Sequence, residues 1–322
     1  MHSPDQLQTL YEQKFSQKTF KDSPANLYQP IHHVMQMKGK RIRPLLLLMA
    51  TDLFGGVVER SLYAAYAMEV FHNFTLVHDD IMDNADIRRG LPTVHKKYGL
   101  NAGILSGDAM LAYTYQYLTQ ISSAYLLPTL SLFNNTAIQI IEGQQMDMDF
   151  ESRTDVSEEE YLVMIGYKTS VLLACSLQTG AILAGANEEG QKLIYDFGFN
   201  LGLSFQIKDD YLDTFGEAAK VGKRIGGDIL QNKKTLLYIT ALKYADKKQK
   251  AHFDSLQTEH DEEKKIAEVK ALYTATGASR LVTEKADALF EQSLQSLNKI
   301  HVSKERKLVL LEIAHKINNR EY

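Results

Sequence analysis

The chain contains few of the residues that interrupt helices or cross-link chains. Its 322 residues include one cysteine, Cys175, together with six prolines and 19 glycines. A single cysteine excludes an intrachain disulfide and indicates a reducing, cytoplasmic setting. The scarcity of proline and glycine leaves room for long helices.

Other absences exclude further classes of protein. The formal net charge of −4 lacks the basic excess of nucleic-acid-binding surfaces, so we expect no nucleic-acid partner. The first residues have no charged-then-apolar pattern, and we expect no secretory leader. No apolar run reaches the length of a membrane span. The longest candidate, residues 44–50, is predicted to start a core helix.

The remaining composition predicts a folded, helical chain. Hydrophobic residues make up 44% and charged residues 24%, which excludes extensive disorder. Apolar residues recur at helical spacing, for example in 62–71 and 162–173, and β-branched alternation is scarce. We predict an all-α fold in one domain over residues 1–322. Helices are expected to start near Pro44 and Ser157, with turns at 187–190 and 226–228 and a solvated helix pair over 243–270.

Two acidic clusters share the pattern D-D-x-x-D. They consist of Asp79, Asp80 and Asp83, and of Asp209, Asp210 and Asp213. On a helix, the first and last aspartates of each cluster lie about one turn apart on one face. Such like charges destabilise a helix, and apolar surroundings make unpaired carboxylates costly. A hard divalent cation such as Mg²⁺, held together with substrate phosphates, relieves both problems. One cluster could be a solvated patch, but two indicate metal sites.

Polar and basic residues flank these clusters. His72 lies nearly two turns before Asp79 on a similar helix face, and Gln206 lies three residues before Asp209. Three basic groups contain Lys40 with Arg43, Arg88 with Arg89, and Lys223 with Lys233. Helix N-termini and guanidinium pairs bind phosphate oxygens. Acidic and basic groups together indicate substrates rich in diphosphate, and the lack of a Ser–His–Asp or Cys–His pattern argues against covalent catalysis.

These motifs occur in a recognisable order. The segment HNFTLVHDDIMDNADIRRGLPTVHKKYG, with GKRIRP before it and FQIKDDYLD and GKRIGGDILQNKK after it, resembles the trans-isoprenyl diphosphate synthase family. That family includes farnesyl and geranylgeranyl diphosphate synthases. The similarity covers residues 30–238. It implies helices around a central cavity, a homodimer, and a prenyltransferase that joins isopentenyl diphosphate to an allylic diphosphate.

The resemblance also assigns roles to individual residues. Three Mg²⁺ ions would be held by Asp79, Asp83, Asp209 and Asp213, with Asp80 and Asp210 in support. The allylic diphosphate would be bound by Arg88, Lys168, Lys223 and Lys233. Isopentenyl diphosphate would be bound by Lys40, Arg43, His72 and Arg89. Thr169 and Gln206 would face the allylic carbon chain and help to stabilise the cation.

Product length follows from the same resemblance. The floor of the chain-elongation cavity is assigned to Phe71, Phe74 and Thr75, and the expected product is C15 to C20, leaning to C20. The alternative for both phenylalanines is plain core packing. The family's basic C-terminal tail is not matched here, which leaves open whether Arg320 contacts substrate.

Two alternatives share parts of this pattern. A class I terpene cyclase has the fold and the first acidic motif, but usually has Ser or Thr where this chain has Asp213. A cyclase also has a Glu four residues later, and Glu217 matches it. The distinction therefore depends on Asp213 and on the residues for isopentenyl diphosphate, and both favour a synthase. An inactive regulatory subunit of a heteromeric synthase typically loses an acidic motif, and both are intact here.

Overall fold

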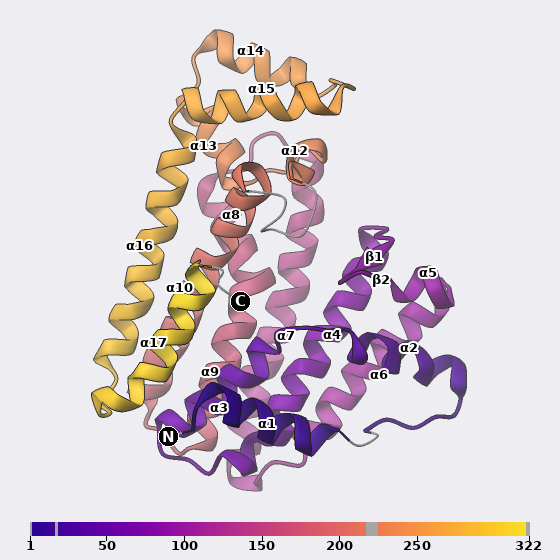
Figure 1. Cartoon of the computed structure of the whole chain (residues 1–322), viewed down its shortest axis with the longest axis vertical. Helices are drawn as coiled ribbons and strands as arrows, with labels where there is room; N and C mark the ends of the chain where they lie inside the picture. The colour runs from indigo at the N-terminus through magenta and orange to yellow at the C-terminus, as the bar shows by residue number, and fades with distance from the viewer. Residues whose placement is uncertain (1, 17–18, 217–224, 320–322) are drawn as a thin grey trace.

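The structure, a computed structural model, describes residues 2–16, 19–216 and 225–319. Helices account for most of these residues, which confirms the all-α prediction (Figure 1). In chain order they are α1 (Pro4–Phe15), α2 (Ala25–Gln36), α3 (Ile42–Leu53), the 3-10 helix η1 (Val58–Ser61), α4 (Leu62–Met82), α5 (Val94–Tyr98), α6 (Leu100–Leu118), α7 (Ser123–Ser152), α8 (Glu158–Ile165), the π-helical turn η2 (Gly166–Ser170), α9 (Val171–Leu183), α10 (Glu188–Phe215), α12 (Gly227–Leu230), α13 (Leu236–Tyr244), α14 (Lys247–Leu256), α15 (Glu262–Ala275), α16 (Ala278–Lys299) and α17 (Lys304–Asn319).

Local sequence explains where several helices begin. Ser157 caps α8, and Glu160 completes the capping box from within the first turn, as predicted. Pro44 lies in the first turn of α3. The predicted turn at 187–190 is instead the start of α10, because the Asn187 side chain accepts a hydrogen bond from the backbone N of Gly190. Gly226 has a φ of 86° and forms the predicted turn before α12.

A small hairpin follows the first acidic cluster, where we predicted no strand. Strand β1 (Ile87–Arg88) pairs antiparallel with β2 (Leu91–Pro92). The turn residues Arg89 and Gly90 both have positive φ, 52° and 77°. Two-residue turns of this kind join antiparallel strands readily. Strands this short carry no alternation that a sequence pattern could reveal.

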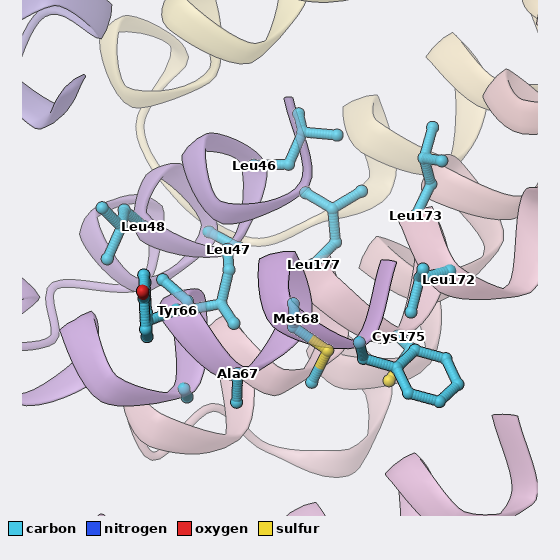
Figure 2. Packing of buried hydrophobic residues seen from close by; sticks show 14 of the residues in the cluster. Leu46, Leu47, Leu48, Tyr66, Ala67, Met68, Leu172, Leu173, Cys175 and Leu177 are labelled. Carbon is cyan, nitrogen blue, oxygen red and sulfur yellow. The ribbon is translucent and has the colours of Figure 1, made fainter. Parts of the chain in front are cut away.

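The larger hydrophobic core lies where α3, α4 and α9 meet. Figure 2 shows Leu46 and Leu47 of α3 in the same buried cluster as Met68 of α4 and Cys175 of α9. The α3 and α9 backbones approach closely at Gly180, where an added Cβ would lie 2.2 Å from the carbonyl oxygen of Leu47. Close backbone contact of this kind needs glycine.

A second hydrophobic core includes residues of α8, α10, α13, α15 and α16. Helix α10 contributes to both cores, with Leu201 in the larger one and Leu203 and Ile207 in the second. The second acidic motif lies near the C-terminal end of this helix.

The charged segment 243–270 forms the predicted helix pair, α14 and α15, which lies at the upper end of the molecule in Figure 1. His252 Nε2 lies 3.0 Å from Glu268 Oε2 across the pair. Within the described residues, one helical stretch, Glu158–Leu183, has the length and hydropathy of a membrane span. Two thirds of its most apolar window (67%) is buried inside the protein, as in a core helix.

Candidate active site

A cavity of about 170 Å³ lies among α7, α8, η2, α10 and α12. It brings together six residues that the sequence predicted: Lys168, Thr169, Gln206, Asp209, Asp210 and Lys233. It also contains residues that the sequence did not indicate, among them Asp147, Tyr161 and Asp228. The cavity is therefore lined by carboxylates and amines from segments far apart in the chain.

Lys168 and Thr169 lie on the π-helical turn η2. Two glycines bring neighbouring helices against this turn. An added Cβ on Gly143 of α7 would lie 2.5 Å from the backbone N of Lys168, and one on Gly202 of α10 would lie 2.7 Å from Ser170 Cα. These close approaches position the widened turn, and such turns occur frequently at functional sites.

A chain of hydrogen bonds links three elements around the cavity. Thr169 Oγ1 donates to Gln206 Oε1 (3.1 Å), and Gln206 Nε2 donates to Asp210 Oδ1 (2.9 Å). The other oxygen of Asp210 accepts a hydrogen bond of 2.6 Å from Tyr161, whose side chain is buried. Burial and the nearby Asp228 carboxylate raise the pKa of Asp210 to about 7. Both oxygens of Asp210 thus have protein partners.

The first acidic motif lies at the C-terminal end of α4. Burial raises the pKa of Asp79 to about 6; the Asp83 charge adds to this and Lys168 opposes it. Asp80 is buried and accepts a hydrogen bond of 2.7 Å from Arg88 Nε on β1. Asp83 follows the last residue of α4 and is exposed. Among the described residues, the side chains of Asp79 and Asp83 have no such arginine partner.

Two lysines connect the acidic motifs. Lys168 Nζ lies 2.5 Å from Asp147 Oδ2, and its charge also acts on Asp79. Lys233 Nζ lies 3.5 Å from Asp228 Oδ1. Burial alone would lower the pKa of Lys233, but four carboxylates outweigh it and raise the pKa above its usual value. They belong to Asp228, Asp147, Asp83 and Asp210. Lys233 therefore lies within electrostatic range of both motifs, and Lys168 acts on the first.

Asp213 does not line the cavity. Its Oδ2 accepts a hydrogen bond of 2.9 Å from the backbone N of Asp228, and its carbonyl oxygen accepts one from Gly226 N. In this arrangement Asp213 holds the start of α12, the helix that carries Asp228. Asp228 lines the cavity, and metal binding by Asp213 stays a prediction.

The predicted residues for the second diphosphate form a separate group beside α4. Arg43 Nη1 donates to His72 Nε2 at 3.0 Å, while Nε of Arg43 is buried without a hydrogen-bond partner. The Arg89 guanidinium lies against Gly39, where an added Cβ would lie 2.7 Å from Nη1. Lys40 is exposed on the same segment. Arg41, between them, pairs instead with the buried Glu69 and has a structural role.

The predicted floor residues are largely buried on α4. Phe71 has no exposed surface and Phe74 is 7% exposed. Their ring centroids lie 5.5 Å apart, and the Thr75 hydroxyl donates to the carbonyl of His72. Three predictions, concerning Lys223, Glu217 and Arg320, lie outside the described residues.

Asp147 and Asp228 were missed because neither belongs to a repeated acidic pattern. A weak signal existed for both. Asp147 lies four residues after Gly143, so the two share the helix face that the glycine presses against η2. Asp228 follows two glycines in a predicted turn and precedes Lys233.

Comparison with known proteins agrees with this geometry. The family model for polyprenyl synthetases matches residues 24–276. The chain belongs to the polyprenyl synthetase family. This confirms the resemblance inferred from the acidic and basic motifs. Within the polyprenyl synthetases, the chain is 43% identical over 272 residues to a geranylgeranyl diphosphate synthase of Sulfolobus acidocaldarius, covering 83% of this chain and 78% of the relative.

Two further relatives bear on fold and product. A crystal structure of a geranylgeranyl pyrophosphate synthase superimposes with a TM-score of 0.95 at 40% identity, covering 99% of each chain. A geranylfarnesyl diphosphate synthase of Natronomonas pharaonis is 37% identical over 236 residues, 68% of this chain and 69% of the relative. The relatives of this chain are thus named for two products of different length, geranylgeranyl and geranylfarnesyl diphosphate.

Proposed function

We propose that this polyprenyl synthetase joins isopentenyl diphosphate head to tail to an allylic diphosphate (dimethylallyl, geranyl or farnesyl). The product is an all-trans prenyl diphosphate of C15 to C20, leaning to C20. One observation carries the proposal: carboxylates of both acidic motifs act on Lys233, and the second motif shares a cavity with Lys168 and Lys233. A separate arginine–histidine group beside it offers a site for the second diphosphate.

The donor set fits Mg²⁺. All candidate ligands are carboxylate oxygens, and the raised pKa of Asp79 reflects burial with too little compensating positive charge. Among the described residues, no three acidic, histidine or cysteine side chains converge tightly enough to hold an ion alone. Mg²⁺ commonly takes one or two carboxylates and completes its shell with substrate phosphates and water. We propose three ions held by Asp79, Asp83, Asp209 and Asp213, with Asp228 as a further carboxylate at the cavity.

The reaction needs no nucleophile from the protein. When bound, Mg²⁺ supplies positive charge that favours departure of the diphosphate. The allylic C–O bond breaks with its electron pair on the leaving diphosphate, leaving an allylic cation. In this proposal Lys168, Lys233, Arg88 and Lys223 stabilise that charge. The alkene of isopentenyl diphosphate attacks the cation and forms the new C–C bond. Loss of a proton, to the departed diphosphate, restores a double bond.

The basic group beside α4 binds the second substrate in this proposal. Arg43, with its buried unpartnered Nε, and Arg89 would hold the diphosphate of isopentenyl diphosphate with Lys40 and His72. Holding both substrates within reach converts the condensation into an effectively unimolecular step. Thr169 and Gln206, which hydrogen-bond to each other at the cavity wall, would present oxygen atoms to the cation.

Product length would be set beneath the first motif. Each helical turn is about 5.4 Å, close to one isoprene unit, so side chains one or two turns before Asp79 can close the cavity. Phe71, Phe74 and Thr75 lie at those positions. The names of the relatives, geranylgeranyl and geranylfarnesyl diphosphate synthase, support products near C20.

The assembly in this proposal is a homodimer. Exposed apolar side chains gather on α6 and α7, including Leu105 (59% exposed), Leu127 (77%), Ile138 (56%) and Ile141 (58%). Such a surface on two neighbouring helices suits burial against a second copy. Helix α10, which belongs to both cores, supports one domain, and the buried free Cys175 supports a cytoplasmic setting.

The deciding experiment is mass spectrometry of products. The purified chain is incubated with Mg²⁺, isopentenyl diphosphate and each allylic diphosphate in turn. A Mg²⁺-dependent C20 diphosphate is expected. Products longer than C25 would contradict the proposed product length of C15 to C20. A cyclic hydrocarbon from the allylic substrate alone would indicate a terpene cyclase, and turnover that appears after adding a partner chain would indicate a regulatory subunit.

A further inference from the structure

A series of aromatic rings runs from the first acidic motif to the proposed floor. It consists of His78, Phe74 and Phe71 on α4 and Phe133 on α7. Successive ring centroids lie 4.9, 5.5 and 4.9 Å apart. His78 immediately precedes Asp79, yet its ring contacts Phe74, one turn earlier. Neither the acidic motif nor the proposed chemistry accounts for this histidine.

His78 is wedged against the backbone of α6. Its Nε2 lies 3.3 Å from the carbonyl oxygen of Ile104 and 3.9 Å from Asp108 Oδ1. A Cβ at position 107 would lie 2.2 Å from Nε2 and 2.5 Å from Cδ2. Gly107 is therefore required for this contact, because even an alanine methyl would overlap the ring.

The contacts restrict Phe74. On its side toward the acidic motif, Phe74 contacts the His78 ring in a T-shaped arrangement. The His78 ring cannot shift toward α6, because it already lies against Gly107. On its other side it meets Phe71, which itself packs against Phe133. Phe74 is thus held between two supported rings, and removing either support would allow it to move.

We propose that His78 is a specificity-determining residue that sets product length by positioning Phe74. The inference rests on the proposed function, in which Phe74 helps to close the cavity for the growing chain. His78 touches neither diphosphate nor cation in this scheme. It should therefore leave early condensations unchanged and affect the step at which the chain reaches Phe74.

Product distributions of His78→Ala, Phe74→Ala and the double variant test the proposal. With farnesyl diphosphate as primer, the ratio of C25 to C20 product is expected to rise about five- to tenfold in His78→Ala, the range that loss of an aromatic pair allows. The rate of condensation from dimethylallyl to geranyl diphosphate should stay within about twofold of the parent. In the double variant the ratio should match that of Phe74→Ala.

Gly107→Ala provides an independent test in case His78→Ala folds poorly. Its methyl group displaces the ring from the Ile104 carbonyl while retaining every aromatic residue, and the ratio of C25 to C20 should again rise. An unchanged distribution in folded His78→Ala and Gly107→Ala, with longer products from Phe74→Ala, would overturn the inference and leave the proposed function standing. Additional lengthening in the double variant would also overturn it. A parent protein that makes no prenyl diphosphate would overturn both.

Discussion

The guanidinium of Arg43 donates a hydrogen bond to an imidazole nitrogen of His72, with 3.0 Å between Nη1 and Nε2. This contact requires a lone pair on Nε2, so His72 is neutral in the folded protein. Burial, together with the charge of Arg43 and further arginines, holds the pKa of His72 well below its usual value of 6.5.

The neutral state of His72 predicts a pH dependence of stability. Below about pH 6.5 the unfolded chain binds a proton at this residue and the folded protein does not, so the free energy of unfolding falls as pH falls. Between pH 7.5 and 5.5 the parent should lose about 1 kcal/mol more than His72→Asn. Urea unfolding at the two pH values measures this. His301→Asn, which alters an exposed histidine, should behave like the parent, and equal losses in all three proteins would refute the assignment.

The sequence was sufficient for part of this arrangement. The i, i+4 spacing of each D-D-x-x-D motif predicted carboxylates along a helix. In the structure the second motif lies within α10, and the first lies at the end of α4, where Asp83 is the C-cap. Metal binding by these carboxylates stays a prediction. Helix periodicity and the Ser157 capping signal predicted most of the fold. Each of these features depends on residues within a few positions of one another, so a sequence pattern can reveal it.

The features that were missed depend on tertiary contact. A π-helical turn at Lys168 and Thr169 differs from an α-helix by its packing against Gly143 and Gly202, which lie in other helices. Asp228 reaches the cavity because Asp213 holds the start of α12, 15 residues later in the chain. No pattern within a single helix contains that information.

Tyr161→Phe should slow the chemical step. The variant loses the hydrogen bond to Asp210 and with it one end of the chain that orients Gln206 and Thr169. A hydrogen bond to a charged group is worth about 1.5–3 kcal/mol, so we expect kcat to fall about tenfold, with KM for both substrates within about twofold. Steady-state kinetics would show this split. Tyr28→Phe removes a hydrogen bond to Tyr113 from another buried tyrosine and should leave kcat unchanged. A rise in KM without loss of kcat would contradict the positioning role.

Gly143→Ala should abolish most activity by displacing the π-helical turn. Its Cβ would lie 2.5 Å from Lys168 N, a backbone atom that cannot rotate away. Overpacking of this kind costs about 1–3 kcal/mol of stability. Gly190→Ala is a matched control, since its Cβ meets the Phe54 ring at 2.9 Å, away from the cavity. Both variants should unfold at lower temperature, but Gly190→Ala should keep its kcat. Equal activities in folded samples would argue against a role for the turn.

Phe74→Ala should lengthen the product by at least one isoprene unit. Removing the ring opens space beneath the first motif, and product analysis by mass spectrometry detects the change. The variant should also lose about 3–5 kcal/mol of stability, as is usual for a buried phenylalanine. Phe253→Ala in the second core should be destabilised similarly and keep the parent product. Unchanged product length in Phe74→Ala would mean that Phe74 only packs in the core.

Mg²⁺ and inorganic diphosphate together should stabilise the protein against heat. The carboxylates that surround Lys168 and Lys233 repel one another, and a bound metal–diphosphate complex would relieve this repulsion. At a concentration 100-fold above Kd, such a ligand adds about 2.7 kcal/mol to the free energy of unfolding. Differential scanning fluorimetry should show a rise in Tm with both components, a smaller rise with either alone, and reversal by a chelator. Asp209→Asn should reduce the response, and a full response in that variant would exclude Asp209 as a ligand.

The π-helical turn also has a consequence for how this chain can vary. Because η2 carries an extra residue, α8 and α9 follow one continuous axis but differ in angular phase by about 100° from an uninterrupted α-helix. Deleting one residue from 166–170 would allow an unbroken helix with more regular hydrogen bonds. The same deletion would rotate the buried leucines of α9 away from α3, or turn Lys168 and Thr169 away from the cavity. We therefore expect that this segment tolerates no single-residue insertion or deletion, although the deletion would make the helix itself more regular.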